Sequence, residues 1–263
     1  HHLIGRGIVR TVDNFGRTGE APSHPRLLDY LAGRLLDSGW SIKSLVREIV
    51  LSRTFSQSSR FDGTAYAIDP ENRYLWRAHR RRLDPESLRD AMLHAAGTLD
   101  RASLDSTVAY LGDQATSVGD NKNRRRTDYP NRSIYLPVIR NDLPELFQAF
   151  DFADPHSATG LRSDTMVPMQ GLFMMNDDAV MQTAKAAARR MLQTESDGEQ
   201  RVRLMYQLIL NADVDSFEQN ELLAFVRRVE AEYAADDHND AEWRAWSAAC
   251  HALFASSRFQ TLE

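Results

Sequence analysis

The chain has 263 residues, of which 42% are hydrophobic and 26% are charged. This composition is typical of a globular protein with a sizeable core and argues against a disordered chain. No apolar run approaches the ~20 residues that a spanning helix requires, so we expect no membrane span. The net charge of −5 argues against a general nucleic-acid binder, because phosphate binding needs a clustered basic surface. The basic runs at 80–82 and 122–126 lack interleaved aromatic residues and favour solvated loops over base recognition.

The first residues, His1 to Gly7, include neither an initiator methionine nor a signal sequence. We therefore expect an N-terminally truncated chain that begins inside a longer protein. The single cysteine, Cys250, lies in an apolar helical stretch. Its position favours a small buried side chain over a reactive thiol, and one cysteine cannot form an intrachain disulfide.

Start and stop signals in the first hundred residues predict helices over 25–36, 42–50 and 85–96. Each begins with a proline at its first position or with a Ser or Asp cap, and glycines follow two of them. The apolar residues of 42–50 recur every three or four positions, which predicts a buried stripe. Weak periodicity over 100–132 predicts a long loop.

The second half of the sequence also has mainly helical periodicity. Ser133 to Val138 is the one extended segment, and its proline restricts it to a sheet edge. The helices predicted after it cover about 145–150, 169–192, 199–210, 217–233 and 241–256. Short connections between them predict antiparallel neighbours.

These elements predict an all-α fold. We expect an irregular multi-helix bundle with at most a small edge strand pair near 133–138. The favoured organisation is a single helical domain over 1–263, and the alternative is a subdivision into 1–132 and 133–263.

Ten polar residues are concentrated in two segments with weak secondary structure, 11–25 and 140–170. They are Asp13, Asn14, Arg17, His24, Arg140, Asp151, Asp154, Arg162, Thr165 and Gln170. Loops on a rigid helical scaffold commonly carry functional sites, so these residues form our candidate polar cluster. Charged groups beside apolar neighbours need partners, and we therefore expect the two segments to meet and their arginines to face their aspartates. Turn, cap and ion-pair roles would explain the same residues as a structural network, and the sequence favours that interpretation.

No catalytic or metal-binding motif supports a specific chemistry for this cluster. His24, Asp151, Asp154 and His156 include zinc-type ligands, but the sequence has no His-x-x-x-His or His-Glu-x-x-His spacing. A Ser-His-Asp arrangement lacks a Gly-x-Ser-x-Gly elbow. We predict no metal and no cofactor in this chain, and the catalytic residues, if any, stay unassigned.

Several separate stretches, in one order along the chain, are similar to a single family. They are residues 1–9, 13–17, 22–29, 39–45, 72–76, 80–84, 132–137, 151–152 and 165–170. Together they resemble the DUF1553 family, the planctomycete PSD-one domain, a domain of unknown function. Met166 and Met169 depart from the family pattern, which more usually has threonine and a small polar residue there.

The resemblance implies a context more than an activity. Domains of this family usually stand at the C-terminal end of large exported proteins, so it implies a periplasmic or cell-surface location. Upstream domains of the same polypeptide would be partners, and one of them is often a c-type cytochrome module. The haem-attachment Cys-x-x-Cys-His is absent from this chain, so any haem would belong to a missing upstream domain.

Two functions from different classes follow. The first is a helical interaction or polymer-binding module of a larger exported protein, whose partner is an upstream domain or an extracellular polymer. The alternative is a hydrolase or redox accessory enzyme that acts on extracellular polysaccharide. The sequence does not decide whether the chain is an enzyme.

Overall fold

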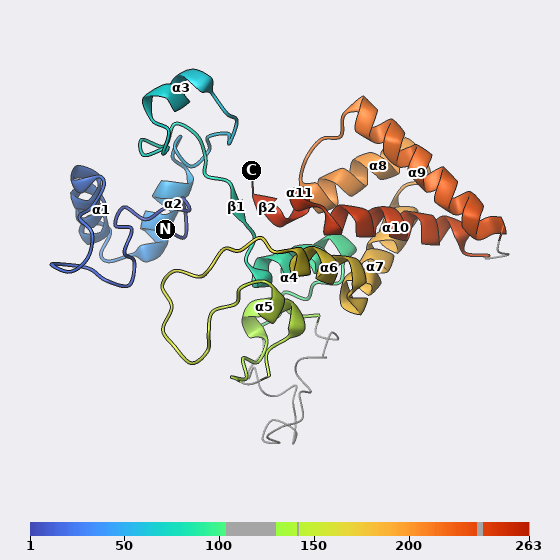
Figure 1. Cartoon of the computed structure of the whole chain (residues 1–263), viewed down its shortest axis with the longest axis horizontal. Coiled ribbons are helices and arrows are strands. Elements are labelled where there is room, and N and C mark those ends of the chain that lie inside the picture. Colours follow the sequence, from blue (N-terminus) through green and yellow to red (C-terminus); the bar gives the residue numbers. More distant parts are fainter. Residues whose placement is uncertain (104–129, 141, 236–238, 263) are drawn as a thin grey trace. The chain divides into compact units, whose positions relative to one another are not determined.

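The computed structural model describes residues 1–103, 130–140, 142–235 and 239–262, and its fold is mainly α (Figure 1). Most of the predicted loop over 100–132, including the basic run at 122–126, therefore lies outside the described residues. The chain forms two compact units. Unit 1 comprises His1–Arg82, Thr159–Leu161 and Thr261–Glu263, and unit 2 comprises Leu83–Ala158 and Arg162–Gln260.

Unit 1 contains three helices, and its first two confirm the predictions. They are α1 (Pro25–Asp37), α2 (Ile42–Val50) and α3 (Gly63–Ile68). The Ser41 hydroxyl caps α2 by accepting the backbone N–H of Ser44 at 3.3 Å, as the sequence indicates. The helix α3, which begins after the cap residue Asp62, was not predicted.

The small sheet also belongs to unit 1. Strand β1 (Arg81–Arg82) pairs antiparallel with β2 (Thr261–Leu262). The edge pair predicted near 133–138 is wrong in its position, because Ser133–Tyr135 form a short 3-10 helix, η2, and the described two-stranded sheet consists of β1 and β2. A three-residue turn buries the Ser133 side chain against Asp90, whose carboxylate accepts from the Ser133 N–H and hydroxyl at 2.7 Å.

Burial in unit 1 is the reverse of the usual pattern. Its buried residues among those described are Ser59, Asp69 and Asn72, all of them polar. Neither α1 nor α2 buries a residue, although both have apolar residues at helical spacing. The predicted buried stripe of α2 is therefore not buried in this structure: Ile42, Val46 and Val50 are exposed, and Leu45 and Ile49 are half-buried.

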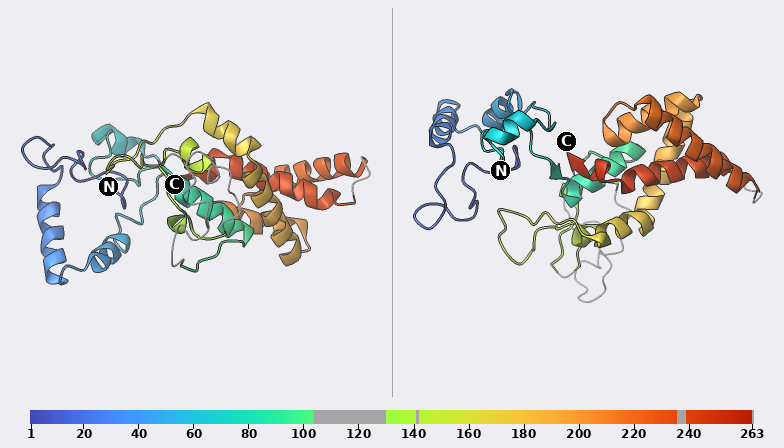
Figure 2. Two further views of the ribbon diagram at one scale, coloured as in Figure 1. Left: turned by 90° about the horizontal axis from the view of Figure 1, so that it is seen from below. Right: turned by 45° about the horizontal axis from the view of Figure 1, so that its top comes forward.

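Unit 2 holds the hydrophobic core. Its helices are α4 (Pro85–Ala96), α5 (Glu145–Ala149), α6 (Pro168–Asn176), α7 (Asp178–Thr194), α8 (Gly198–Met205), a π-helical turn η3 (Tyr206–Leu210), α9 (Ser216–Ala235), α10 (Ala241–Ala255) and α11 (Ser257–Gln260). The helix α10 packs against α7 and α9 (Figure 2). Small residues allow the close approach, because Ala184 and Ala188 of α7 and Ala245 and Ala249 of α10 are fully buried or nearly so.

One predicted helix is two helices in the structure. The sequence predicts a continuous helix over about 169–192, but α6 ends at Asn176 and α7 begins at Asp178. Between them Asp177 has an extended backbone, and its carboxylate caps α7 by accepting the Val180 N–H at 3.1 Å. This break gives α6 and α7 different directions.

Along the chain, the first change of unit lies between residues 82 and 83, and others follow at 158/159, 161/162 and 260/261. The alternative subdivision predicted one boundary, between 132 and 133. Residues on both sides of that predicted boundary belong to unit 2, where the Arg89 guanidinium of α4 donates to the Asn131 carbonyl at 2.9 Å and to the Ser133 hydroxyl at 3.3 Å. Among the described residues, no helix is long and apolar enough to cross a membrane.

Candidate functional site

The ten residues of the predicted polar cluster divide between the two units. Asp13, Asn14, Arg17 and His24 belong to unit 1, and the other six belong to unit 2. Each group is described within its own unit, so the convergence of all ten stays a prediction.

In unit 1 the first three residues form a surface turn. The Asn14 carbonyl accepts from the Thr11 hydroxyl at 2.7 Å, and the Asn14 side chain accepts from the Thr18 hydroxyl at 2.9 Å. Asp13 lies against Gly160, where an added Cβ would stand 2.1 Å from its carboxylate oxygen. Residues 159–161, from the second predicted segment, thus contact the first segment inside unit 1. Arg17 is exposed, and the bonds within the turn fit the structural interpretation.

His24 lies at a polar pocket of about 290 Å³ in unit 1. It is the N-cap residue of α1, but its side chain makes no capping bond. Instead its Nδ1 lies 3.0 Å from the Ser23 hydroxyl, which donates to the Ile8 carbonyl at the same distance. The pocket is also lined by Glu20 and Glu71. Serine, histidine and paired carboxylates are the residue types of hydrolytic sites.

Both carboxylates of this pocket form ion pairs with arginines. Arg6 lies 3.6 Å from Glu71, and Arg10 lies 3.9 Å from Glu20. Three of these four side chains are at least half exposed and both contacts are longer than 3.5 Å, so the pairs contribute little stability. They leave the pocket polar and solvated.

In unit 2 the structure brings together Asp151, Thr165 and Gln170. The Asp151 carboxylate accepts from the Thr165 N–H at 2.9 Å and from its hydroxyl at 2.8 Å. The Gln170 amide donates to the Ala149 carbonyl at 3.0 Å, and its oxygen accepts from the Val167 N–H at the start of α6. These bonds close the loop between α5 and α6, which is a structural role.

Arg162 and Asp154 have other partners than those predicted. The Arg162 guanidinium forms a bidentate pair with Glu86 at 2.7 and 2.9 Å, a partner that the sequence did not predict. Its cation also stands 5.0 Å from the centre of the Phe152 ring. Asp154 accepts from the His156 N–H at 2.9 Å in a local turn, and this bond holds the pKa of its carboxyl below the ordinary value. Arg140 is exposed.

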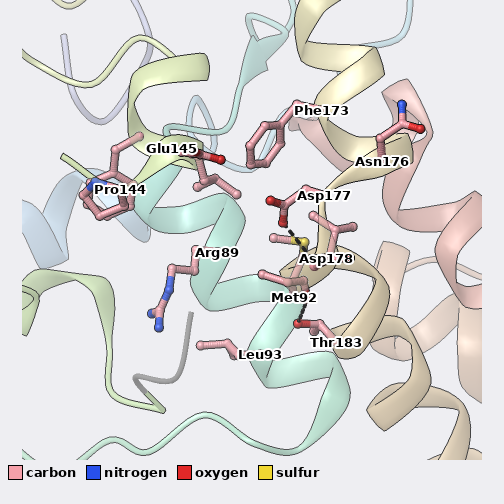
Figure 3. A pocket seen from close by; sticks show the side chains of 14 residues that line it. Arg89, Met92, Leu93, Pro144, Glu145, Phe173, Asn176, Asp177, Asp178 and Thr183 are labelled. Atoms are coloured by element: carbon pink, nitrogen blue, oxygen red, sulfur yellow. Dashed lines mark hydrogen bonds between the residues drawn. The ribbon is translucent and has the colours of Figure 1, made fainter. Parts of the chain in front are cut away.

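The largest described pocket of unit 2 was not predicted from the sequence. It has a volume of about 550 Å³ and lies among α4, α5, α6 and α7. Figure 3 shows the Phe173 ring and the Asp177 carboxylate beside this space, and Glu145 stands at its edge. Burial raises the pKa of the Asp177 carboxyl, and the charges of Glu145 and Asp178 raise it further.

A sequence signal for this pocket exists in Asn176-Asp177-Asp178. Polar residues of this kind within an otherwise apolar helical pattern indicate a helix end and a new N-cap. Interpreted as a helix end followed by a new N-cap, these three residues would have predicted the break between α6 and α7 beside the pocket. The part of the chain that the structure describes contains no group of three or more His, Cys, Asp or Glu residues placed to hold a metal ion.

Cys250 is a buried core side chain. Its sulfur lies 3.7 Å from the sulfur of Met205 and 3.9 Å from that of Met191. Burial raises the pKa of this thiol to about 12. The thiol is therefore a core group, as predicted, and not a nucleophile.

The described residues form a mainly helical fold with polar turn networks, and none of their His, Cys, Asp and Glu residues form a group of three or more placed to hold a metal ion. The family described as Protein of unknown function (DUF1553) matches residues 1–226, and the chain belongs to this family. No curated protein and no solved structure matches the chain.

Proposed function

We propose that the chain is a helical interaction module of a larger exported protein, and that α1 and α2 of unit 1 form the surface that binds an upstream domain of the same polypeptide. The observation that carries this proposal is the absence of any buried apolar residue among the described residues of unit 1. A compact unit of this size normally encloses a hydrophobic core.

Large apolar side chains are exposed on unit 1 instead. On α1, α2 and their flanks they are Leu27, Leu28, Tyr30, Leu36, Trp40, Ile42, Val46, Val50 and Leu51. Trp40, Ile42 and Leu51 are each at least 70% exposed. Soluble monomers rarely present such a set over two adjacent helices, and apolar surface of this kind marks a binding face.

The two helices are held together by polar bonds, which leaves their apolar side chains available. Glu48 of α2 accepts from the Tyr30 hydroxyl at 2.9 Å and from the Arg34 guanidinium at 3.0 Å, both on α1. Both bonds lie at the surface, so they align the helices without enclosing a core. A partner that covers the apolar face would supply the burial that unit 1 lacks, at about 25 cal/mol for each Å² removed from water.

The proposed setting is a planctomycete-type protein at the periplasm or cell surface, in which a c-type cytochrome module is among the upstream domains. The family resemblance supports this setting. Any haem would be held by that module and not by this chain.

The test measures binding between the upstream region, produced as a separate protein, and this chain by isothermal titration calorimetry. Ile42→Ser and Leu51→Ser should each weaken binding by at least tenfold, which corresponds to about 1.4 kcal/mol. Phe217→Ser is the matched control, because Phe217 is equally exposed at 73% but lies in unit 2. Equal losses in all three variants, or no loss in any, would contradict the proposal.

A second measurement compares melting temperatures. A chain extended upstream should melt higher than residues 1–263 alone, and the tryptophans of unit 1 should become less accessible to a quencher. Agreement of the two melting temperatures would mean that the upstream region does not cover this face.

The alternative is an enzyme that acts on extracellular polysaccharide, as a hydrolase or a redox accessory. The polar pocket of unit 1 favours it, because Glu20 and Glu71 both line that pocket beside His24. Glycoside hydrolysis needs two carboxyl groups on opposite sides of the scissile bond. Release of reducing sugar by the chain, lost in both Glu20→Gln and Glu71→Gln, would establish this alternative.

A further inference from the structure

The pocket of unit 2 among α4, α5, α6 and α7 has the features of a small-molecule site. Its volume of about 550 Å³ falls within the usual range for ligand pockets. Apolar side chains form much of its wall, among them Met92 and Leu93 of α4 and Phe173 of α6. Figure 3 shows these side chains and the acidic residues around one space.

The charges that line this pocket are mostly negative. Among the described residues that line it, Glu145, Asp177 and Asp178 contribute three carboxylates and Arg89 contributes one cation. No described Lys, Arg or His lies within ion-pair distance of any of the three carboxylates. Burial is the main cause that raises the pKa of the Asp177 carboxyl, and the charges of Glu145 and Asp178 act in the same direction.

Arg89 does not neutralise these carboxylates, because its guanidinium is engaged elsewhere. It donates to the Asn131 carbonyl at 2.9 Å and to the Ser133 hydroxyl at 3.3 Å, and it stands 3.8 Å from the Asp90 carboxylate. Its charge is therefore shared with a segment outside the pocket. A positively charged ligand would relieve the remaining negative potential, whereas an anion would increase it.

We propose that this pocket binds a small organic cation, an ammonium group attached to an apolar body. The ammonium group would lie between Asp177, Glu145 and the Phe173 ring, and the apolar body would contact Met92 and Leu93. An aromatic face beside a carboxylate attracts a cation through the ring quadrupole as well as by charge. Phe173 is held in place for this contact by Phe150, whose ring packs edge-on against it with centroids 5.9 Å apart. This ligand site is independent of the docking face proposed for unit 1.

The probe for the test is benzyltrimethylammonium, compared with benzyl alcohol and benzoate, which keep the ring and change the charge. Binding to the whole chain is measured by ligand-observed NMR and calorimetry. We expect the cation to bind with a Kd of about 1 mM or lower, and the neutral and anionic probes to bind at least tenfold more weakly. Equal binding of the three probes, or no binding of the cation at about 10 mM, would overturn the proposal.

Two variants remove charge while they keep the fold. Asp177→Asn retains a side chain that can cap α7, since Asn and Asp are equally good N-caps, and Glu145→Gln changes a first-turn residue of α5. Each should weaken binding of the cation by about tenfold. The matched control is Asp197→Asn, another aspartate N-cap of unit 2, which caps α8 by accepting the Gln200 N–H at 3.0 Å and does not line the pocket. Loss of binding in the control to the same degree as in Asp177→Asn would contradict the assignment of the site.

Discussion

Asp151 offers a sharp test of the structural interpretation of the polar cluster. In a buried ion pair, its replacement by alanine would cost about 3–5 kcal/mol, because an uncompensated charge would remain. The structure shows the carboxylate accepting from the N–H and hydroxyl of Thr165 at 2.9 and 2.8 Å, with the backbone in the left-handed region at φ 57. Two bonds to a half-buried carboxylate contribute about 1–2 kcal/mol together at the low end of their range, and alanine at positive φ costs about 1 kcal/mol more.

We therefore expect Asp151→Ala to lower the free energy of unfolding of unit 2 by about 2–3 kcal/mol. Asp151→Gly removes the same hydrogen bonds but tolerates the positive φ, so it should cost about 1 kcal/mol less than alanine. Asp151→Asn keeps an acceptor and suits the left-handed region, so its effect should be smallest. The predicted order of destabilisation is alanine, glycine, asparagine.

The assay is equilibrium urea unfolding, followed by the fluorescence of Trp243 and Trp246 in unit 2. Hydrogen exchange of a peptide that contains Thr165 adds a local readout, because its amide should lose protection in the alanine and glycine variants. Two results would refute the reasoning. A loss above about 4 kcal/mol for alanine would indicate a buried ion pair, and equal losses for glycine and alanine would show that the positive φ carries no cost.

Three further predictions concern the two units separately. Burial raises the pKa of Cys250 to about 12, so its thiol should stay unreactive toward Ellman's reagent in the folded chain. In urea the thiol should react within minutes. Fast labelling of the folded chain would contradict this prediction. Burial lowers the pKa of His79 below its usual 6.5, so near that pH the unfolded chain binds more protons than the folded chain. Unit 1 should therefore lose stability as pH falls below about 6.5. In His79→Gln the free energy of unfolding should depend less steeply on pH, and an unchanged dependence would refute the assignment. Phe254→Ala should lower the free energy of unfolding by about 3–5 kcal/mol, because the Phe254 ring is fully buried. Phe217→Ala should change it by less than about 0.5 kcal/mol, because Phe217 is 73% exposed. Similar melting temperatures for the two variants would contradict the core assignment.

Local chemistry was readable from the sequence. The caps predicted for α2 and α4 formed, since the Ser41 hydroxyl accepts the Ser44 N–H at 3.3 Å and Asp84 accepts the Ser87 N–H at 2.7 Å, and Gly97 ends α4 with φ 74. These features depend on groups within four residues of each other, so the residue types alone predict them. For the same reason the mainly α fold was predicted correctly.

Contacts between distant residues were not readable in this way. Arg162 pairs with Glu86, 76 residues away, although two aspartates of its own segment were the expected partners. Segment 133–138 has the composition of a strand, but a bond network with Asp90 of α4 favours a 3-10 turn. Tertiary partners decide such cases, because strand preferences span only about 1 kcal/mol and change with the packing environment.

The unburied stripe of α2 links the sequence to the proposed function. A helix of nine residues is too short to be stable alone in water, so its stability must come from packing of its apolar face. In unit 2 the same kind of periodicity is satisfied, since α7 buries Val180, Ala184 and Met191 in the core. In unit 1, Ile42 remains 71% exposed although its spacing to the other apolar residues of α2 predicts burial. The apolar spacing thus indicates that this face is to be buried, but it does not identify the partner that buries it. An upstream domain bound over α1 and α2 would bury it. The Ile42→Ser and Phe217→Ser comparison measures whether that partner exists.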